Sequence, residues 1–191
     1  DKHRDTTSSK VALGVYNPMV LKRFTPVWKV HEQLVPLYNF LDAFESIFNQ
    51  TIHTRLKLLR KLNSVFEQNL WSEKSQKYEL SLFMNPTLIE YDHSDINSDF
   101  GFGEIHFAGK VDLSQMISLF RDQLISEEMF LDEEFNYSSL IIENNCVVYN
   151  SYQASKIVFC EGSRLPKNPF FSYLPLVRTK GELLTVELKN L

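Results

Sequence analysis

The sequence predicts an α/β (α+β) fold, in which a mixed, largely antiparallel sheet is flanked by helices. Apolar residues recur at three- and four-residue steps over 30–48 and 113–124, which is typical of amphipathic helices. Two apolar runs, 140–142 and 146–149, flank a Glu-Asn-Asn turn and indicate a β-hairpin. A further apolar run, 156–162, predicts a strand buried on both faces inside the sheet.

That last run ends at Gly162 and is followed by a segment with two prolines, which cannot continue a strand or a helix. The end of a buried strand is a place where an α/β sheet brings its backbone close to a ligand. A core strand with an ordinary exit turn is the alternative interpretation.

Composition limits the class of function. Hydrophobic residues make up 43% and charged residues 23% of the chain, which is the profile of a folded protein rather than a disordered one. The formal net charge of −4 argues against nucleic acid as a partner, because nucleic acids require a basic face. No apolar run is long enough to span a bilayer, and no signal peptide is visible. We therefore expect a cytoplasmic protein with no membrane partner.

Two cysteines, Cys146 and Cys160, lie in apolar runs and lack the spacing of metal ligands. We expect both to be buried free thiols in a reducing compartment. The five histidines show no metal spacing and no pairing with a nucleophile motif, so we predict no metal site.

The N-terminal stretch suggests an anion site. Ser8 and Ser9 can cap a short helix, whose free N–H groups suit a phosphate. An ordinary capped turn is the alternative. Thr25 and Pro26 then predict the start of the helix that reaches residue 48, and Pro36 should bend or divide that helix.

Local signals predict the remaining elements. A capping box at Ser64 and Glu67 starts a helix over 65–73, with Trp71 facing inwards. Asp112 caps the helix over 113–124. Strands are expected at 51–62, with a basic face, and at 78–83, 87–91 and 183–188.

The pair Gly101 and Gly103 does not form a dinucleotide fingerprint. His106 occupies the third glycine position, and a strand rather than a helix follows. These glycines instead predict a bulge or a close approach at the start of a strand.

Three segments together resemble the D-amino-acid-oxidase-like family of FAD-dependent oxidoreductases. They are Ser-Ser-Lys-Val-Ala-Leu-Gly-Val-Tyr-Asn-Pro at 8–18, Gly-Phe-Gly-Glu at 101–104 through Asp-Leu at 112–113 and the helix to 124, and the run 157–184. Their order and spacing agree with the family. The resemblance implies a partial FAD-binding domain of the glutathione-reductase-like type from 1–24 and 135–167. It implies a substrate-binding domain from 25–134 and 168–191.

By position, the resemblance places Ser8 and Ser9 at the pyrophosphate of FAD. It places Ala12 and Gly14 at a close approach of the cofactor, and Gly162 beside the FAD at the end of the buried strand. Small side chains and free N–H groups are what a bulky anionic cofactor needs.

The chain lacks the GxGxxG loop that the family carries on its first strand-helix turn, and it lacks the family's C-terminal flavin-contacting segment. It also opens without an initiator methionine. We therefore expect a fragment of a larger enzyme that is inactive alone. No catalytic residue is assigned. Lys22 and Arg23 could face an anionic substrate, with a solvated turn as the alternative.

The implied function is oxidation of an amine or amino-acid-like small molecule by hydride transfer to flavin, in which the cofactor supplies the chemistry and the protein supplies orientation. The alternative is a non-catalytic ligand- or protein-binding domain derived from the same fold, which would explain the missing glycine loop directly.

Overall fold

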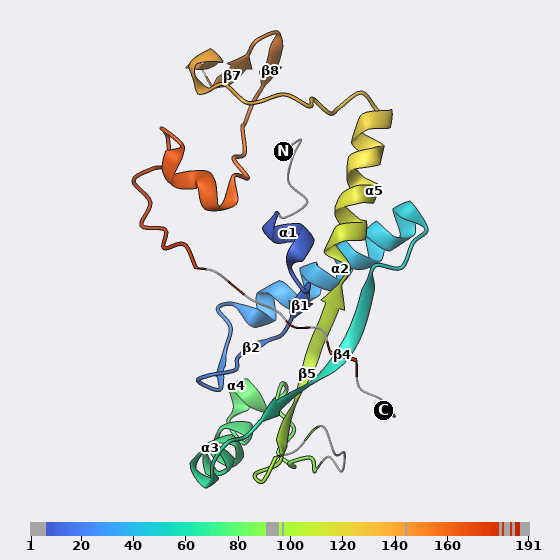
Figure 1. Ribbon diagram of the computed structural model, residues 1–191, viewed down its shortest axis with the longest axis vertical. Helices are drawn as coiled ribbons and strands as arrows, with labels where there is room; N and C mark the ends of the chain where they lie inside the picture. Colours follow the sequence, from blue (N-terminus) through green and yellow to red (C-terminus); the bar gives the residue numbers. More distant parts are fainter. Residues whose placement is uncertain are drawn as a thin grey trace. The chain divides into compact units, whose positions relative to one another are not determined.

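A computed structural model describes residues 7–90, 96, 98–143, 145–179, 181, 184, 186 and 187 (Figure 1). These residues form two compact units. One contains the described residues between 4 and 130 together with 186 and 187, and the other contains those between 131 and 184. Both units combine helical turns with small antiparallel sheets, so the α+β class is confirmed.

The boundary between the two units differs from the boundaries of the predicted domains. Residues 7–24 lie in the same unit as 25–130, and residues 168–179 lie in the same unit as 135–167. The assignment of 1–24 and 135–167 to an FAD-binding domain stays a prediction. No helix among the described residues has both the length and the apolar character needed to cross a membrane.

A three-stranded antiparallel sheet organises the first unit, with β5 (Phe102–Val111) between β1 (Val15–Tyr16) and β4 (His53–Lys61). The strand predicted at 51–62 is therefore confirmed. The register shifts between Leu56 and Leu58 of β4, where two residues of β5 oppose one of β4. One of them, Phe107, has a φ of +60°. This β-bulge bends the sheet beside Phe107.

The helix expected from Thr25 begins later. Met19–Val20 (β2) pairs with Thr25–Pro26 (β3) in a small hairpin, and the helix α2 spans Val30–Phe48. The prediction was wrong because Pro26 fits an extended edge position as well as a first helical turn. Lys29, with a φ of +53°, precedes the helix instead. Pro36 does not divide α2, which runs as one helix.

The first core cluster lies where β4 and β5 meet two helices, α3 (Val65–Ser75) and α4 (Tyr78–Ser81). Trp71 of α3 is fully buried, as predicted. Its ring packs edge-on against the Phe24 ring, with the two ring centroids 5.2 Å apart. The indole Nε1–H donates to the Asn85 carbonyl at 2.9 Å. A Cβ on Gly103 would lie 2.4 Å from the Trp71 ring, so the close approach predicted for this glycine is confirmed.

The strand expected at 78–83 was wrong, because this stretch contains α4. Leu80, Phe83 and Met84 are buried at three- and four-residue spacing, which is the period of a helix rather than of a strand. Of the strand expected at 87–91, only Ile89 forms a bridge, with Phe102; Tyr91 lies outside the described residues.

The second core cluster joins α2 to α5 (Leu113–Ser126) and the end of β5. Asp112 caps α5 as predicted: its carboxylate accepts the Gln115 N–H at 2.9 Å. Leu41 and Phe44 of α2 are buried against Ile52 and Val111. This cluster fixes α2 over the sheet end from which Tyr16 and His53 project.

The second unit contains an antiparallel meander of β6 (Leu140–Glu143), β7 (Cys146–Tyr149) and β8 (Tyr152–Ala154). The predicted hairpin is confirmed, and Asn145 adopts a φ of +60°, as such a turn requires. Two short 3₁₀ turns complete the unit, η1 (Tyr137–Ser139) and η2 (Gly162–Lys167).

The buried strand predicted at 156–162 was wrong. The stretch 156–161 is irregular, and Val158 is 80% exposed. Phe159 contacts the rings of Phe135, Phe170 and Phe171, so one side of the run is covered and the other is not. A strand is buried on both faces only when a layer of structure covers each face. In this unit only one side of the described run is covered.

Burial of the two thiols was also predicted wrongly. Cys160 is exposed and Cys146 is half-buried, although both are free as expected. The final strand expected at 183–188 falls largely outside the described residues; Leu184 and Val186 belong to no strand.

Candidate functional site

The residues predicted to contact FAD lie in both units. Ser8 and Ser9 begin the four-residue helix α1 (Ser8–Val11) and are exposed, and Ala12 follows its end. The helix forms as expected, but Thr7 rather than a serine precedes it, without a side-chain cap. A helix this short has little macrodipole, so any anion there would depend on backbone N–H groups.

A close approach does occur at Gly14, although its partner is protein. Gly14 has a φ of +71°, and a Cβ there would lie 1.9 Å from the carbonyl oxygen of Val111. The Gly14 carbonyl accepts the Val111 N–H at 3.0 Å. Glycine is therefore required here to hold the start of β1 against the end of β5.

Gly162 lies in the second unit, at the start of η2. It has a φ of +55° and no atom within 4 Å of a Cβ position. Because residues 156–161 are irregular, Gly162 does not lie at the end of a buried strand, where a close approach to a cofactor was expected. Contact of these five residues with FAD stays a prediction.

A polar cluster that the sequence did not predict lies on one face of the sheet, next to Gly14. It contains Tyr16 of β1, Tyr38 of α2, and His53 and Arg55 of β4. We call it the Tyr-His-Arg cluster. All four residues belong to the first unit.

The cluster depends on a glycine in the central strand β5, because a larger residue there would block Tyr16. Tyr16 and Arg55 both pair with Gly109, so the three residues form one row across the sheet. A Cβ on Gly109 would lie 2.4 Å from the Tyr16 hydroxyl oxygen. The glycine thus lets the Tyr16 ring cross β5 and reach the opposite strand.

There the Tyr16 hydroxyl lies 2.7 Å from Nε2 of His53. The backbone of His53 is held as well, because its N–H donates to Oε1 of Glu45 at 2.8 Å. Tyr38 covers the pair from α2, with ring centroids 6.2 Å from Tyr16 and 6.1 Å from His53. Its hydroxyl reaches the Phe107 carbonyl, at the bulge, at 3.4 Å.

The surroundings of Tyr16 favour its protonated form. Burial raises the pKa of Tyr16 well above its usual range, and the neighbouring Tyr38 hydroxyl raises it further. The positive charge of Arg55 acts in the opposite direction and does not outweigh them. Tyr16, like any phenol, is neutral at pH 7, and its raised pKa extends the neutral form to higher pH. The cluster's fixed charge comes from Arg55.

Arg55 is exposed, and its guanidinium lies 4.6 Å from the Tyr38 ring centroid. In the part of the chain that the structure describes, no carboxylate lies within 4 Å of it. Arg60, in contrast, forms an ion pair with Glu67. An arginine held by an aromatic ring without an acidic partner is suited to binding an anion.

A second titratable group, Glu104 of β5, is only 5% exposed. Its burial tends to raise the pKa, but hydrogen bonds from Lys57 (3.2 Å) and Asn85 (3.3 Å) outweigh this and hold the pKa below its usual range. Nε2 of His106 lies 3.8 Å from the same carboxylate. With its acceptors used by Lys57 and Asn85, Glu104 has a structural role.

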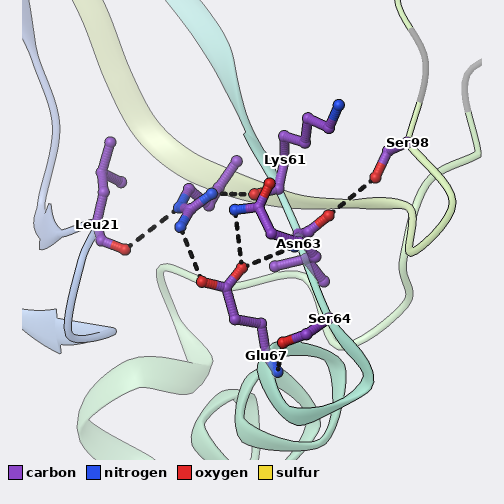
Figure 2. Close-up of polar contacts among 8 residues, drawn as sticks. Leu21, Lys61, Asn63, Ser64, Glu67 and Ser98 are labelled. Atoms are coloured by element: carbon purple, nitrogen blue, oxygen red, sulfur yellow. Dashed lines mark hydrogen bonds and ion pairs between the residues drawn. The ribbon is translucent and has the colours of Figure 1, made fainter.

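The network around Arg60 and Glu67 is also structural (Figure 2). The Glu67 carboxylate accepts the Asn63 N–H at 2.9 Å and Nη2 of Arg60 at 3.2 Å. Ser64 Oγ accepts the Glu67 N–H at 3.2 Å, which confirms half of the capping box. The other half differs, because the Glu67 carboxylate bonds to Asn63 rather than to the backbone of Ser64. Nε of Arg60 donates to the Leu21 carbonyl, which joins β4 to the β2–β3 hairpin.

The other residues considered from the sequence lie apart from the Tyr-His-Arg cluster. Lys22 and Arg23 are exposed in the turn between β2 and β3. Within the described residues, no three His, Cys, Asp or Glu side chains gather as metal ligands would.

The cluster was not predicted from the sequence. Tyr16 and His53 are 37 residues apart, and only the β1–β5–β4 pairing brings them together. One signal was present: His53 and Arg55 alternate in a predicted strand and must therefore share a face.

Comparison with known proteins adds no family assignment. The chain matches no protein-family model. No solved structure matches it either.

Proposed function

We propose that the chain is part of an FAD-dependent oxidoreductase that oxidises a carbon–nitrogen bond of an amine or amino-acid-like substrate. One observation supports this most. Two of the segments that resemble the D-amino-acid-oxidase-like family, 8–18 and 101–124, are far apart in sequence yet meet in space. Val15 and Tyr16 pair with Lys110 and Gly109, and Gly14 packs on Val111.

The residues proposed to hold the FAD are small, and all except the half-buried Gly14 are exposed, as residues beside a bulky cofactor need to be. Ser8, Ser9 and Ala12 are exposed and small, and the first-turn N–H groups of α1 are of the kind that bind phosphate oxygens. Gly162 is exposed, and the space around its Cα is open. When bound, the flavin would accept hydride from the substrate carbon.

The protein's own contribution would be orientation. In this proposal the first unit presents the Tyr-His-Arg cluster to the substrate, and Tyr38 and the sheet hold the cluster in place. The phenol of Tyr16 and the imidazole of His53 would provide hydrogen-bonding groups for the substrate, and Arg55 would provide a positive charge.

The alternative function, a non-catalytic binding domain derived from the same fold, is favoured by the absence of a GxGxxG loop from the sequence. Such a domain would retain the Tyr-His-Arg cluster but bind no flavin. Flavin content therefore separates the two proposals.

The test uses a pair of charge variants of the full-length protein. The double variant Ser8→Asp, Ser9→Asp places two carboxylates where the pyrophosphate is proposed to bind. The double variant Ser114→Asp, Ser118→Asp adds the same charge at exposed positions of α5. Each protein is incubated with FAD and freed of unbound cofactor, and its flavin absorbance is then measured.

We expect flavin in the unmodified protein and in the α5 variant, and a large loss in the Ser8 and Ser9 variant. Equal flavin in all three proteins would remove Ser8 and Ser9 from the site. No flavin in any of them would favour the non-catalytic alternative.

A further inference from the structure

We infer that Glu161, Tyr137 and Asn168 form a hydrogen-bonded lock in the second unit, and that this lock positions Gly162 for the cofactor. We call these three residues the Glu161 lock. The lock itself follows from the contacts within the second unit. Its role toward FAD rests on the proposed function, in which Gly162 lies beside the cofactor. Because the three residues would act through Gly162, they are positioning residues.

Asn168 is buried although its surroundings are not. In the described stretch 156–179 it is the only fully buried residue, and its neighbours Lys167 and Pro169 are both exposed. An amide is costly to bury unless its donors and acceptors find partners. The burial of this polar side chain therefore indicates that its hydrogen bonds hold the segment together.

Each polar atom of Asn168 has a partner. Nδ2 donates to Oε2 of Glu161 at 2.6 Å, and Oδ1 accepts the Phe170 N–H at 2.8 Å. The backbone N–H donates to the Leu165 carbonyl at 2.9 Å, and the carbonyl accepts the Ser172 N–H at 2.9 Å. Asparagine suits this position because its side chain both donates and accepts, whereas a carboxylate could only accept.

Both carboxylate oxygens of Glu161 are used as well. Oε2 accepts from Asn168, and Oε1 accepts the hydroxyl of Tyr137, which begins η1. The Tyr137 ring is itself packed, with its centroid 5.4 Å from that of Phe135 and 6.1 Å from that of Phe159. The carboxylate thus joins η1 to the residue that follows η2, and it closes the loop between 161 and 168.

Gly162 lies at the start of this closed loop and has little support of its own. It has a φ of +55°, and no atom lies within 4 Å of a Cβ position there. Because glycine has the widest backbone freedom of any residue, its neighbours must fix its direction. Glu161 directly precedes it, and the Glu161 carbonyl accepts the Arg164 N–H at 3.1 Å. The lock therefore sets where the Gly162 backbone points, and with it the surface that the cofactor would meet.

The test reverses one hydrogen bond of the lock. Asn168→Asp places two carboxylates against each other and should break the lock. Adding Glu161→Gln should restore it, because the new amide at position 161 can donate to the new carboxylate and still accept from Tyr137. Asn136→Asp is the control. It adds the same charge in the second unit at an exposed side chain whose Oδ1 accepts the Ser138 N–H, as a carboxylate also can.

The first readout needs no flavin. It is the backbone amide signal of Gly162 in the NMR spectrum of the 191-residue chain, and the amide signals of 146–149 report whether the meander is folded. We expect the Gly162 signal to shift or broaden in Asn168→Asp and to return toward its original position in the double variant. In Asn136→Asp it should stay unchanged.

The second readout is the dissociation constant of FAD, measured with the full-length protein by flavin fluorescence. Asn168→Asp should weaken FAD binding about tenfold or more, because a hydrogen bond to a charged group is lost. The double variant and Asn136→Asp should bind FAD nearly as the unmodified protein does. Recovery in the double variant separates the lock from a general effect of the added charge.

An unchanged Gly162 signal in Asn168→Asp, or no recovery in the double variant, would overturn the lock. Normal FAD binding by a variant whose Gly162 signal has moved would overturn the role toward the cofactor. If Asn168→Asp does not fold, recovery of the fold in the double variant supports the lock, and failure of both variants to fold overturns it. An unmodified protein that binds no flavin would contradict the proposed function and the role toward FAD, while the Gly162 signal would still decide whether the lock exists.

Discussion

Replacing Gly103 with alanine should destabilise the first unit strongly. The new Cβ would lie 2.4–2.5 Å from three atoms of the Trp71 ring, well inside van der Waals contact. The ring cannot easily move away, since it is fully buried and its Nε1–H donates to the Asn85 carbonyl. Overpacking of this kind costs about 1–3 kcal/mol.

Displacement of the indole would also weaken its hydrogen bond, which contributes about 1 kcal/mol. The reduced freedom of the unfolded chain offsets about 0.5 kcal/mol. The expected loss in the free energy of unfolding is therefore about 2–3 kcal/mol, a large part of the 5–15 kcal/mol typical of a domain. With a urea dependence of about 1–3 kcal/mol per molar, the unfolding midpoint should fall by about 1–3 M.

The fluorescence of Trp71 is the assay, measured in a Trp28→Phe background because Trp28 is the other tryptophan and is 75% exposed. Gly181→Ala is the matched control, since no atom lies within 4 Å of the new Cβ. An unchanged midpoint in the Gly103 variant, with emission from Trp71 as in the unmodified protein, would refute the packing of Trp71 on β5.

Two further predictions concern the polar groups of the sheet. The folded-state pKa of Glu104 is depressed, so its ion pair with Lys57 stabilises the protein above the unfolded pKa of about 4.3 and is lost as pH falls below it. Urea midpoints measured from about pH 7 to pH 3 should fall for the unmodified protein and change less for Glu104→Gln; parallel curves would contradict this role. Tyr16→Phe should cost about 1 kcal/mol and shift the NMR signals of the His53 ring. Tyr78→Phe, at a side chain that is 97% exposed, should do neither, and equal effects of the two changes would remove the Tyr16–His53 contact.

Elements with strong local signals were predicted well. The helix α3 follows from Ser64 and Glu67, α5 from Asp112, and the β6–β7 hairpin from an Asn turn. In each case a side chain satisfies a backbone group a few residues away, so distant residues decide little.

Elements that depend on tertiary context were predicted poorly. Pro26 suits the first turn of a helix or the edge of a sheet, and only pairing with Met19 decides between them. The apolar run 156–162 was predicted to be a strand buried on both faces, but the described part of this unit covers only one side of it. The Tyr-His-Arg cluster was missed for the same kind of reason, because its members meet only through the pairing of three strands and a covering helix.

The proposed function, oxidation of an amine or amino-acid-like substrate by a bound flavin, can be tested in one experiment. The most direct measurement is the visible absorption spectrum of the FAD-loaded, full-length protein, mixed without oxygen with a set of amino acids and with the corresponding decarboxylated amines. We expect the flavin band to bleach with at least one of these amino acids or amines, because the flavin would accept hydride from the substrate carbon. A protein that binds no flavin, or one whose flavin band is unchanged by every compound, would contradict the proposed function.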